Sequence, residues 1–276
     1  MTCINKIRLT VGLLLGLVAS VWAADVPYIT LASTTSTQAS GFFDYFLPIV
    51  KQKLGFDVRV IAVGTGQALK LGEKGDADVV VVHDKVGEMK FVNAGFGIER
   101  REVMYNDFVF VGPSADPAGV GAATDAVTAL SNIGQQRALF VSRADDSGTH
   151  RAELRLWDLT KVDYRSASGT WYKELGAGMG ATLNIASALN AYTLSDRATW
   201  LTFQNRGDLK LLYAGDPRLF NQYSVILVNP RRYPQLKTDL ARQFADFMCS
   251  AEGQQVIAAY KVEDTVLFTP NCTATH

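Results

Sequence analysis

Short apolar segments alternate with amphipathic segments along most of this chain of 276 residues, and this alternation restricts the fold more than any other feature. The clearest apolar segment is residues 78–82 (DVVVV), a continuous run typical of a strand buried on both faces. Further strands are predicted at 28–32, 57–63, 108–111, 138–141, 210–213 and 224–228, and helices at 42–53, 67–71, 89–94, 147–156, 236–248 and 253–260. Strands that alternate with helices predict an α/β architecture with parallel sheets.

The first 23 residues have the pattern of a cleaved secretory signal peptide. Lys6 and Arg8 form a positive region before the short apolar run at 11–18, and Val21-Trp22-Ala23 supplies a small residue for cleavage. The apolar run is too short for a membrane anchor, and Cys3 precedes it, which argues against a lipoprotein. We therefore expect export to the periplasm as a soluble protein.

The balanced net charge of the chain excludes partners that are recognised through a strong electrostatic field of the whole protein. The full chain has 27 basic and 27 acidic residues, and loss of Lys6 and Arg8 with the signal peptide leaves 25 basic residues and a net charge of −2. Such a balance predicts no nucleic-acid partner, because nucleic-acid binders carry a basic surface. A ligand must instead be recognised by a local site.

Three strand-to-helix junctions carry the residues that point to a ligand. The first is Ser33-Thr34-Thr35-Ser36-Thr37, the second is Gly64-Thr65-Gly66-Gln67, and the third extends from Ser142 to His150 and contains Arg143. In an open α/β sheet such junctions lie at the carboxyl ends of the strands, where ligands bind. Helix N-termini, hydroxyls, glycines and an arginine together are suited to a small oxyanion.

Each junction also has an interpretation that needs no ligand. Hydroxyl residues before a helix are usually N-caps, and Gly64-Thr65-Gly66 alone could form a tight turn. The glycine pattern does not match a dinucleotide fingerprint, since Leu69 stands where the third glycine belongs. The occurrence of all three junctions in one chain favours the oxyanion site, in which Asp145 and Asp146 hold the loop and orient Arg143.

No motif of the chain predicts catalysis. HExxH, GxSxG and metal-spaced clusters of cysteine and histidine are absent from the sequence. His83 ends the buried strand and is expected to make structural hydrogen bonds. A secreted hydrolase that uses Ser36 or Ser147 as nucleophile is the alternative, but no base is predicted beside either serine.

Two cysteines remain after removal of Cys3 with the signal peptide. Cys249 and Cys272 form an even pair in an oxidising compartment, which suggests a disulfide. The alternative is two unpaired cysteines, because Cys249 falls in an apolar helical segment and could simply be buried.

The same junctions, with several further motifs, give the chain a resemblance to the tungstate-binding proteins of ABC transporters. The resemblance extends from about residue 28 to residue 260 and includes the segments 34–37, 60–78, 105–108, 111–113, 142–150, 178–183 and 191–197. The hydroxyl motif of that family usually reads TTTS, and here the same positions read Ser33-Thr34-Thr35-Ser36.

The resemblance implies a type II periplasmic binding protein fold, in which two α/β lobes are joined by two crossover strands and the ligand cleft lies between the lobes. Residues 24–109 and 224–276 would form lobe 1, and residues 110–223 would form lobe 2. The ligand contacts that the resemblance implies are Ser33, Thr34, Thr35, Ser36 and Thr65 of lobe 1, and Arg143, Ser147, Gly148 and Thr149 of lobe 2.

The function implied by the resemblance is binding without chemistry. The ligand would be tungstate, or molybdate, held as an intact oxyanion, with no cofactor and no free metal cation. The partner would be an ABC transporter permease in the inner membrane, and the protein itself is expected to be a monomer. Sulfate and phosphate are the rival ligands, although a cage made only of donors disfavours an oxyanion that carries its own proton.

Overall fold

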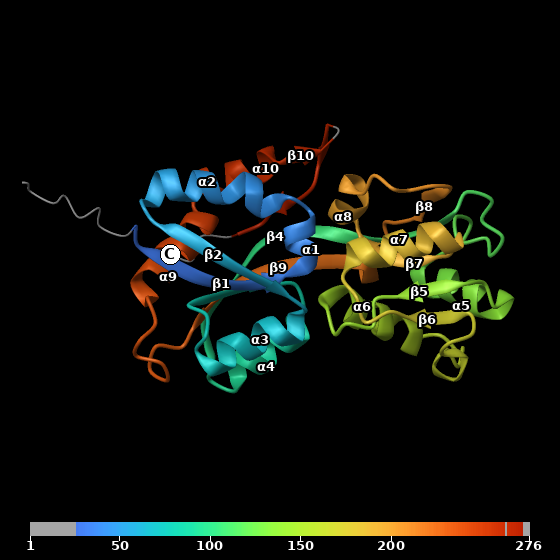
Figure 1. Cartoon of the computed structure of the whole chain (residues 1–276), viewed down its shortest axis with the longest axis horizontal. Coiled ribbons are helices and arrows are strands. Elements are labelled where there is room, and N and C mark those ends of the chain that lie inside the picture. The colour runs from blue at the N-terminus through green and yellow to red at the C-terminus, as the bar shows by residue number, and fades with distance from the viewer. Residues whose placement is uncertain (1–25, 263, 273–276) are drawn as a thin grey trace, which may run out of the picture.

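Residues 26–262 and 264–272 are described by the computed structural model, which Figure 1 shows as two α/β bodies placed end to end. The strands are β1 (Tyr28–Thr34), β2 (Asp57–Val63), β3 (Val79–Val82), β4 (Gly97–Pro113), β5 (Phe140–Ser142), β6 (Tyr172–Glu174), β7 (Thr193–Asp196), β8 (Leu209–Tyr213), β9 (Phe220–Val228), β10 (Lys261–Val262), β11 (Thr265–Val266) and β12 (Thr269–Pro270). The α-helices are α1 (Thr35–Ala39), α2 (Phe42–Leu54), α3 (Thr65–Lys74), α4 (Lys85–Asn93), α5 (Ala126–Gln136), α6 (Gly148–Asp158), α7 (Met179–Leu189), α8 (Arg197–Thr202), α9 (Thr238–Cys249) and α10 (Ala251–Ala259). Two 3₁₀ helices, η1 (Arg165–Ala167) and η2 (Pro217–Leu219), complete the elements.

The signal peptide predicted at residues 1–23 lies outside the described residues. Within the described part, none of the helices has the length and apolar character that a bilayer crossing requires.

We use the name lobe 1 for the body around β1, β2 and β3, and lobe 2 for the body around β5, β6 and β7 (Figure 1). Each lobe has apolar clusters on both faces of its strands. In lobe 1 the side chains of β1 alternate between the faces, so that Ile29 packs towards α2 and α9 while Ala32 packs towards α3 and α4. In lobe 2, Phe140 and Val141 divide in the same way between the cluster of Trp157 and the cluster of α7.

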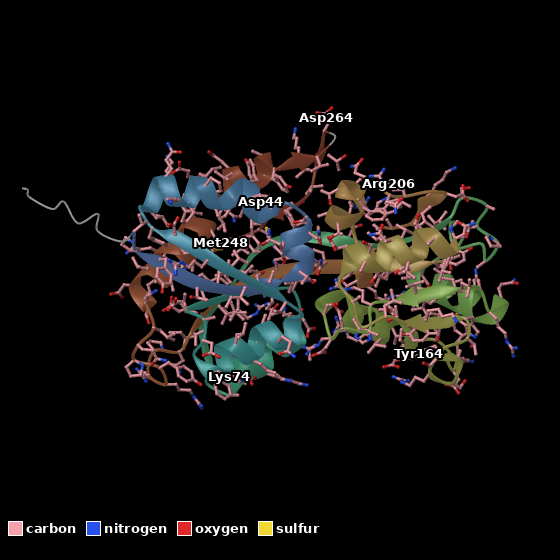
Figure 2. All side chains as sticks on the ribbon, viewed as in Figure 1. Asp44, Lys74, Tyr164, Arg206, Met248 and Asp264 are labelled. Carbon is pink, nitrogen blue, oxygen red and sulfur yellow. A yellow bond between two sulfur atoms is a disulfide. The ribbon has the colours of Figure 1, made fainter. Side chains whose placement is uncertain are left out.

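Helix α9 shows how sequence periodicity builds this core. Ala241, Phe244, Ala245 and Met248, the last labelled in Figure 2, recur at helical spacing and are all fully buried in the main cluster of lobe 1. Burial of such a stripe fixes the helix against the sheet, because each large apolar side chain contributes roughly 1.5–3 kcal/mol on transfer from water.

The main sheet has the strand order β12-β4-β9-β3-β1-β2, and β7 and β8 pair with the far end of β4. Strand β3 consists of four valines, each with no exposed surface, which confirms the prediction of a strand buried on both faces. Its central position places the residues that follow it, beginning with His83, at the carboxyl edge of the sheet beside the ends of β1 and β2.

The prediction of parallel sheets is wrong for part of the fold. Strands β1, β2 and β3 are parallel to one another, and β5 is parallel to β6. The pairs that involve β4 and β9 are antiparallel, because these long strands carry the chain out of lobe 1 and back again. The alternation pattern detects βαβ units but not strands that return without a crossover helix.

Strand β4 belongs to both lobes. Its first part, up to Asp107, pairs with β9, and its last part, from Phe108 to Pro113, pairs with β7 and β8. Beside this change of partner, the guanidinium of Arg197 forms two hydrogen bonds of 2.6 Å to the carboxylate of Asp107. The lobe boundaries at 109/110 and 223/224 stay a prediction, and the pairing of β4 puts the change of sheet between Asp107 and Phe108.

A disulfide joins Cys249, the last residue of α9, to Cys272 near the end of the described chain, with a Cα–Cα distance of 5.2 Å. The structure thus confirms the predicted pair and rules out the alternative of two free thiols. The segment closed by the disulfide includes β12, which pairs with β4 at Tyr105 and Met104.

The disulfide gives a direct chemical prediction. The chain that begins at residue 24 should contain no titratable thiol when it is denatured without reductant, because both of its cysteines are bonded. Reduction should release two thiols and lower the free energy of unfolding by about 3 kcal/mol, from the entropy of the opened loop. Thiol titration and chemical unfolding with and without reductant measure both effects, and a free thiol before reduction would contradict the pairing.

Candidate functional site

The three polar junctions converge where the two lobes meet. The hydroxyl of Thr65, in lobe 1, accepts a hydrogen bond of 2.7 Å from the backbone N–H of Gly148 in lobe 2. The guanidinium of Arg143 donates a bond of 3.1 Å to the hydroxyl of Thr35. These two hydrogen bonds join residues that lie 83 and 108 positions apart, so the site is assembled by the contact between the lobes.

The hydroxyl groups of the first junction differ in their hydrogen-bond partners. Strand β1 continues through Thr34, and the hydroxyl of Ser33 donates to the carbonyl of Val81 at 2.6 Å, inside the sheet. The hydroxyl of Thr34 accepts from the N–H of Thr37 and caps α1, as the interpretation without a ligand proposed. Ser33 therefore has no free hydroxyl proton for a ligand, whereas Thr35 and Ser36 extend beyond the end of the strand.

Arg143 is the most unusual side chain of the site, because it is a charged group with only 1% of its surface exposed. Its Nη2 donates to Asp145 at 2.6 Å and to Thr35, while its Nε and Nη1 have no hydrogen-bond partner. Asp145 also accepts from the N–H of Ser147, so this aspartate orients Arg143 and holds the loop, as predicted. Buried donors without a partner are costly, and they mark a place where a bound group can accept from them.

The third junction presents the beginning of α6 to the same place. The hydroxyl of Ser147 caps this helix by accepting from the N–H of His150 at 3.1 Å. Thr149 is 1% exposed, and its hydroxyl oxygen has no hydrogen-bond partner. Between them, Gly148 lies so close to His83 that an added Cβ would be 2.7 Å from the ring atoms Cε1 and Nδ1. Only glycine allows this approach of the two lobes.

His83 was expected to be a structural hydrogen-bonding residue, and the structure gives both ring nitrogens a partner. Its Nε2 lies 3.1 Å from the hydroxyl of Ser36, and its Nδ1 lies 2.9 Å from Oδ1 of Asn221. The pKa of His83 is lowered to about 4. Burial is the main cause and the charge of Arg143 adds to it, although the hydrogen bond to Asn221 opposes the shift. The expectation that no base lies beside a serine is wrong for Ser36, because the fold brings His83 to its hydroxyl.

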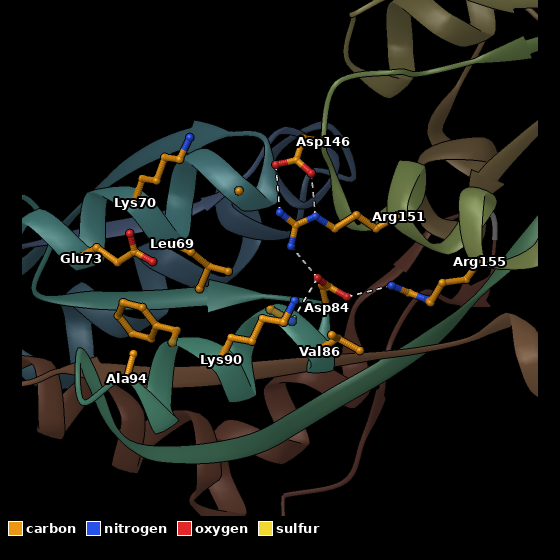
Figure 3. A pocket seen from close by; sticks show the side chains of 13 residues that line it. Leu69, Lys70, Glu73, Asp84, Val86, Lys90, Ala94, Asp146, Arg151 and Arg155 are labelled. Carbon is orange, nitrogen blue, oxygen red and sulfur yellow. Dashed lines mark hydrogen bonds and ion pairs between the residues drawn. The ribbon is translucent and has the colours of Figure 1, made fainter. Parts of the chain in front are cut away.

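Ion pairs outside the polar site also join the lobes, as Figure 3 shows. The carboxylate of Asp84, at the start of α4, accepts bonds from Arg151 at 2.7 Å and from Arg155 at 3.0 Å, both on α6. Arg151 also bonds both carboxylate oxygens of Asp146, at 2.7 and 2.9 Å. The prediction that Asp146 orients Arg143 is therefore wrong, because its side chain is paired with Arg151.

The cavity drawn in Figure 3, of about 470 Å³, lies against these ion pairs. Its walls combine Lys70 and Lys90 with Glu73, and none of the predicted ligand contacts lines it. The polar site around Arg143 is the better candidate for an anion, because its donors are buried and its wall is contributed by both lobes.

Asn221 and Asp84 were not predicted as contributors to this region, and His83 was predicted only as a structural hydrogen-bonding residue. Asp84 follows His83 directly after the buried strand β3, so the rule that ligands bind at the carboxyl ends of strands could have pointed to it. Asn221 lies on β9, an antiparallel strand, and no sequence signal connects it to His83, 138 positions away.

Glu153 supports the loop of Arg143 from within lobe 2. It is buried on α6 and accepts bonds from the hydroxyls of Ser142, at 2.8 Å, and Tyr172, at 2.7 Å. Burial raises the pKa of this carboxyl from 4.5 to about 8, although the two hydroxyls oppose the shift. The folded protein therefore holds Glu153 protonated at neutral pH.

This protonated carboxyl predicts a pH dependence of stability. Because its folded-state pKa is raised, the stability it contributes is complete below about pH 4.5 and is lost as the pH rises towards about 8. Glu153→Gln, which keeps a neutral side chain, should lose less stability than the unchanged protein over this range, and the difference should reach a few kcal/mol. Urea unfolding at several pH values measures the effect, with the exposed Glu73→Gln as control. Parallel pH profiles of the unchanged and Glu153→Gln proteins would contradict the assignment.

Comparison with known proteins gives consistent results over nearly the whole described chain. Residues 20–252 match the PBP superfamily domain. The tungstate-binding protein TupA of Peptoclostridium acidaminophilum is 44% identical over 247 residues, which cover 88% of this chain and 85% of that protein.

Two solved structures are similar in both sequence and fold. The tungstate-binding protein TupA from Desulfovibrio alaskensis G20 is 43% identical, with a TM-score of 0.77 and coverage of 90% of this chain and all of that one. The structure described as the tungstate ABC transporter from Geobacter sulfurreducens is 47% identical, with a TM-score of 0.77, and the match covers 84% of this chain and 98% of that one.

Proposed function

This chain belongs to the PBP superfamily and, within it, to the family of tungstate-binding proteins, and from this membership we propose that it captures tungstate between its two lobes. The ligand stays chemically unchanged and is passed on to an ABC transporter permease. Molybdate, a dianion of nearly the same size and charge, is the second ligand of the same site.

The observation that carries the proposal is the buried guanidinium of Arg143 with two nitrogens that have no partner. A tetrahedral dianion has only acceptor oxygens, and a guanidinium offers it strong, charge-assisted hydrogen bonds at any physiological pH. The unpartnered hydroxyl of Thr149 adds a donor from the same lobe.

The remaining contacts follow from the arrangement of the junctions. In lobe 1 we assign ligand contacts to Thr35, Ser36 and Thr65, and in lobe 2 to Ser147 and Thr149, around Arg143. Thr34 supports them as the cap of α1. Gly148 lies between the lobe 2 contacts, and its N–H donates to Thr65. Ser33 is left out of the proposed set, because its hydroxyl is bonded inside the sheet.

A site built from two lobes couples binding to closure. Donors of lobe 2 and hydroxyls of lobe 1 can both reach one ion only when the lobes are together, so the ligand shifts the population towards the closed form. The ion pairs of Asp84 with Arg151 and Arg155 stabilise the same closed form without contact to the ligand. The closed form, present in the periplasm as a monomer, is the state that we propose the permease recognises.

Ser36, His83 and Asn221 are arranged like the nucleophile, base and orienting residue of a hydrolase. Two observations favour binding over hydrolysis. A pKa of about 4 makes His83 a weak base, and the relatives that resemble this chain are named for binding.

Competitive calorimetry with tungstate, molybdate, sulfate and phosphate tests the proposal. Tungstate and molybdate should bind with 1:1 stoichiometry and raise the melting temperature, since they bind only the folded protein. Sulfate should bind more weakly. A larger shift of the melting temperature with phosphate than with tungstate would reject the ligand assignment.

A further inference from the structure

The charge of the proposed site does not balance the charge of its ligand. Tungstate carries two negative charges, whereas Arg143 carries one positive charge and already shares it with Asp145 at 2.6 Å. Transfer of a dianion into a buried site is costly unless its charge is compensated. A second cationic group is therefore expected among the residues beside the ligand contacts. This inference rests on the proposed function.

His83 is the titratable group in direct contact with a proposed ligand contact of lobe 1. Its Nε2 lies 3.1 Å from Oγ of Ser36, and its ring stacks on Tyr223 with a centroid distance of 4.7 Å. From the other lobe, Gly148 packs against the ring when the cleft is closed. The imidazole thus contacts both halves of the site.

A chain of hydrogen bonds fixes the proton positions in the free protein. The amide nitrogen of Asn221 donates to Asn106 at 2.7 Å, so its Oδ1 accepts from Nδ1 of His83 at 2.9 Å. The neutral ring then carries its proton on Nδ1, and its Nε2 is an acceptor. The hydroxyl proton of Ser36 therefore points to His83, and Ser36 presents a lone pair, the wrong polarity for an oxyanion.

We propose that His83 is the second cationic group of the oxyanion site and takes up one proton from solvent when the dianion binds. The new proton lies on Nε2, which then donates to Oγ of Ser36. The hydroxyl of Ser36 turns and donates to an oxygen of the ligand. No covalent bond of the protein changes apart from the gain of this proton, and the imidazolium adds a second positive charge to that of Arg143, which is shared with Asp145.

The charged surroundings of His83 determine the direction of this change. Arg143 and Arg155 oppose protonation of the ring, and Asp84 favours it. Lys85 and Glu102 line a cavity of about 230 Å³ together with His83 and Arg155. Burial, and to a smaller degree Arg143, lower the pKa of His83 to about 4 in the closed form. A dianion bound to Ser36 and Arg143 offsets the repulsion from Arg143 and attracts the imidazolium, so the pKa of His83 rises when the ligand binds. Between the free and bound pKa values, affinity for tungstate decreases as the pH increases.

Calorimetry in buffers of different ionisation enthalpy counts the protons taken up with the ligand. With sodium tungstate, between about pH 6 and 8, the unchanged protein should take up close to one proton at the lower pH and fewer at the higher pH. His83→Gln offers an amide N–H to Ser36 without titrating, so it should bind with no proton uptake and no pH dependence over this range. His150→Gln removes the other described histidine near the site and should retain the uptake.

Imidazole NMR of the unchanged protein gives a measurement that does not depend on a variant. Signals of His83 should show a neutral ring in the free protein and an imidazolium in the tungstate complex at the same pH. Tungstate binding without proton uptake, or with an unchanged neutral ring, would overturn the role of His83 and leave the proposed function intact. Asp196 is a second candidate for the proton, because its carboxylate is fully buried, interacts with Arg143 and has an oxygen without a hydrogen-bond partner. Uptake that persists in His83→Gln and disappears in Asp196→Asn would assign the proton to the aspartate instead. Absence of any tungstate binding would instead refute the proposed function.

Discussion

Arg143→Ala is expected to lower the affinity for tungstate by a factor on the order of 1,000, because loss of one partner of a buried, hydrogen-bonded charge pair costs about 3–5 kcal/mol. The side chain supplies the two buried nitrogens without a protein partner and keeps its third bonded to Asp145 and Thr35. Its removal leaves the carboxylate of Asp145 facing the anion without compensation. Isothermal calorimetry with tungstate measures the loss.

The matched variants separate charge from geometry. Arg143→Lys keeps one positive charge but cannot donate from a planar fork, so its affinity should fall between those of the unchanged protein and Arg143→Ala. Arg165→Ala removes an exposed arginine of the same lobe, paired with Asp158, and should bind like the unchanged protein. An affinity of Arg143→Ala within a factor of a few of the unchanged protein would refute the site.

Gly148→Ala is expected to prevent full closure of the cleft. The added Cβ would lie 2.7 Å from two ring atoms of His83 and 3.1 Å from its carbonyl oxygen, and these groups are buried. Relief of such overlap costs about 1–3 kcal/mol, which corresponds to a loss of affinity on the order of 10- to 100-fold. The free protein can relieve the overlap by opening, so its melting temperature should change little.

Gly180→Ala is the matched control, because Gly180 also lies in the first turn of a lobe 2 helix and its Cβ would meet nothing within 4 Å. This variant should bind tungstate normally. Calorimetry and small-angle scattering with and without tungstate distinguish the two variants. A compact, ligand-induced closed form of Gly148→Ala with normal affinity would contradict the closeness of the lobes at this point.

The part of the site that could be predicted from the sequence is the part built at the ends of parallel strands. Thr35, Thr65 and Arg143 each follow a strand, and the general position of ligands in α/β sheets brings such residues together. The alternation of strands and helices likewise predicted β3 and the helices α2, α3, α4, α9 and α10 of lobe 1, but not the short helix α1. These features can be predicted from the local pattern of apolar residues together with the rule that ligands bind at the carboxyl ends of parallel strands.

The remainder depends on contacts between distant segments. Asn221 reaches His83 because β9 returns antiparallel beside β3, and no periodicity of the sequence indicates that direction. The short strands β6 and β7 were also missed, because segments of three or four residues carry too little pattern. The bond of Ser33 inside the sheet could not be foreseen either, since β1 extends two residues further than its apolar run.

The continuity of β4 through both lobes has a consequence for how the proposed closure would depend on the size of the ligand. One strand continues through both lobes, and Arg197 is bonded to Asp107 where the strand changes partners, so we expect the lobes to move by rotation about this point and not by sliding. A larger ion held by the same donors would keep the lobes at a wider angle. Under the proposed function, the radius of the bound ion would therefore set the angle between the lobes, and the proposed permease would recognise that angle.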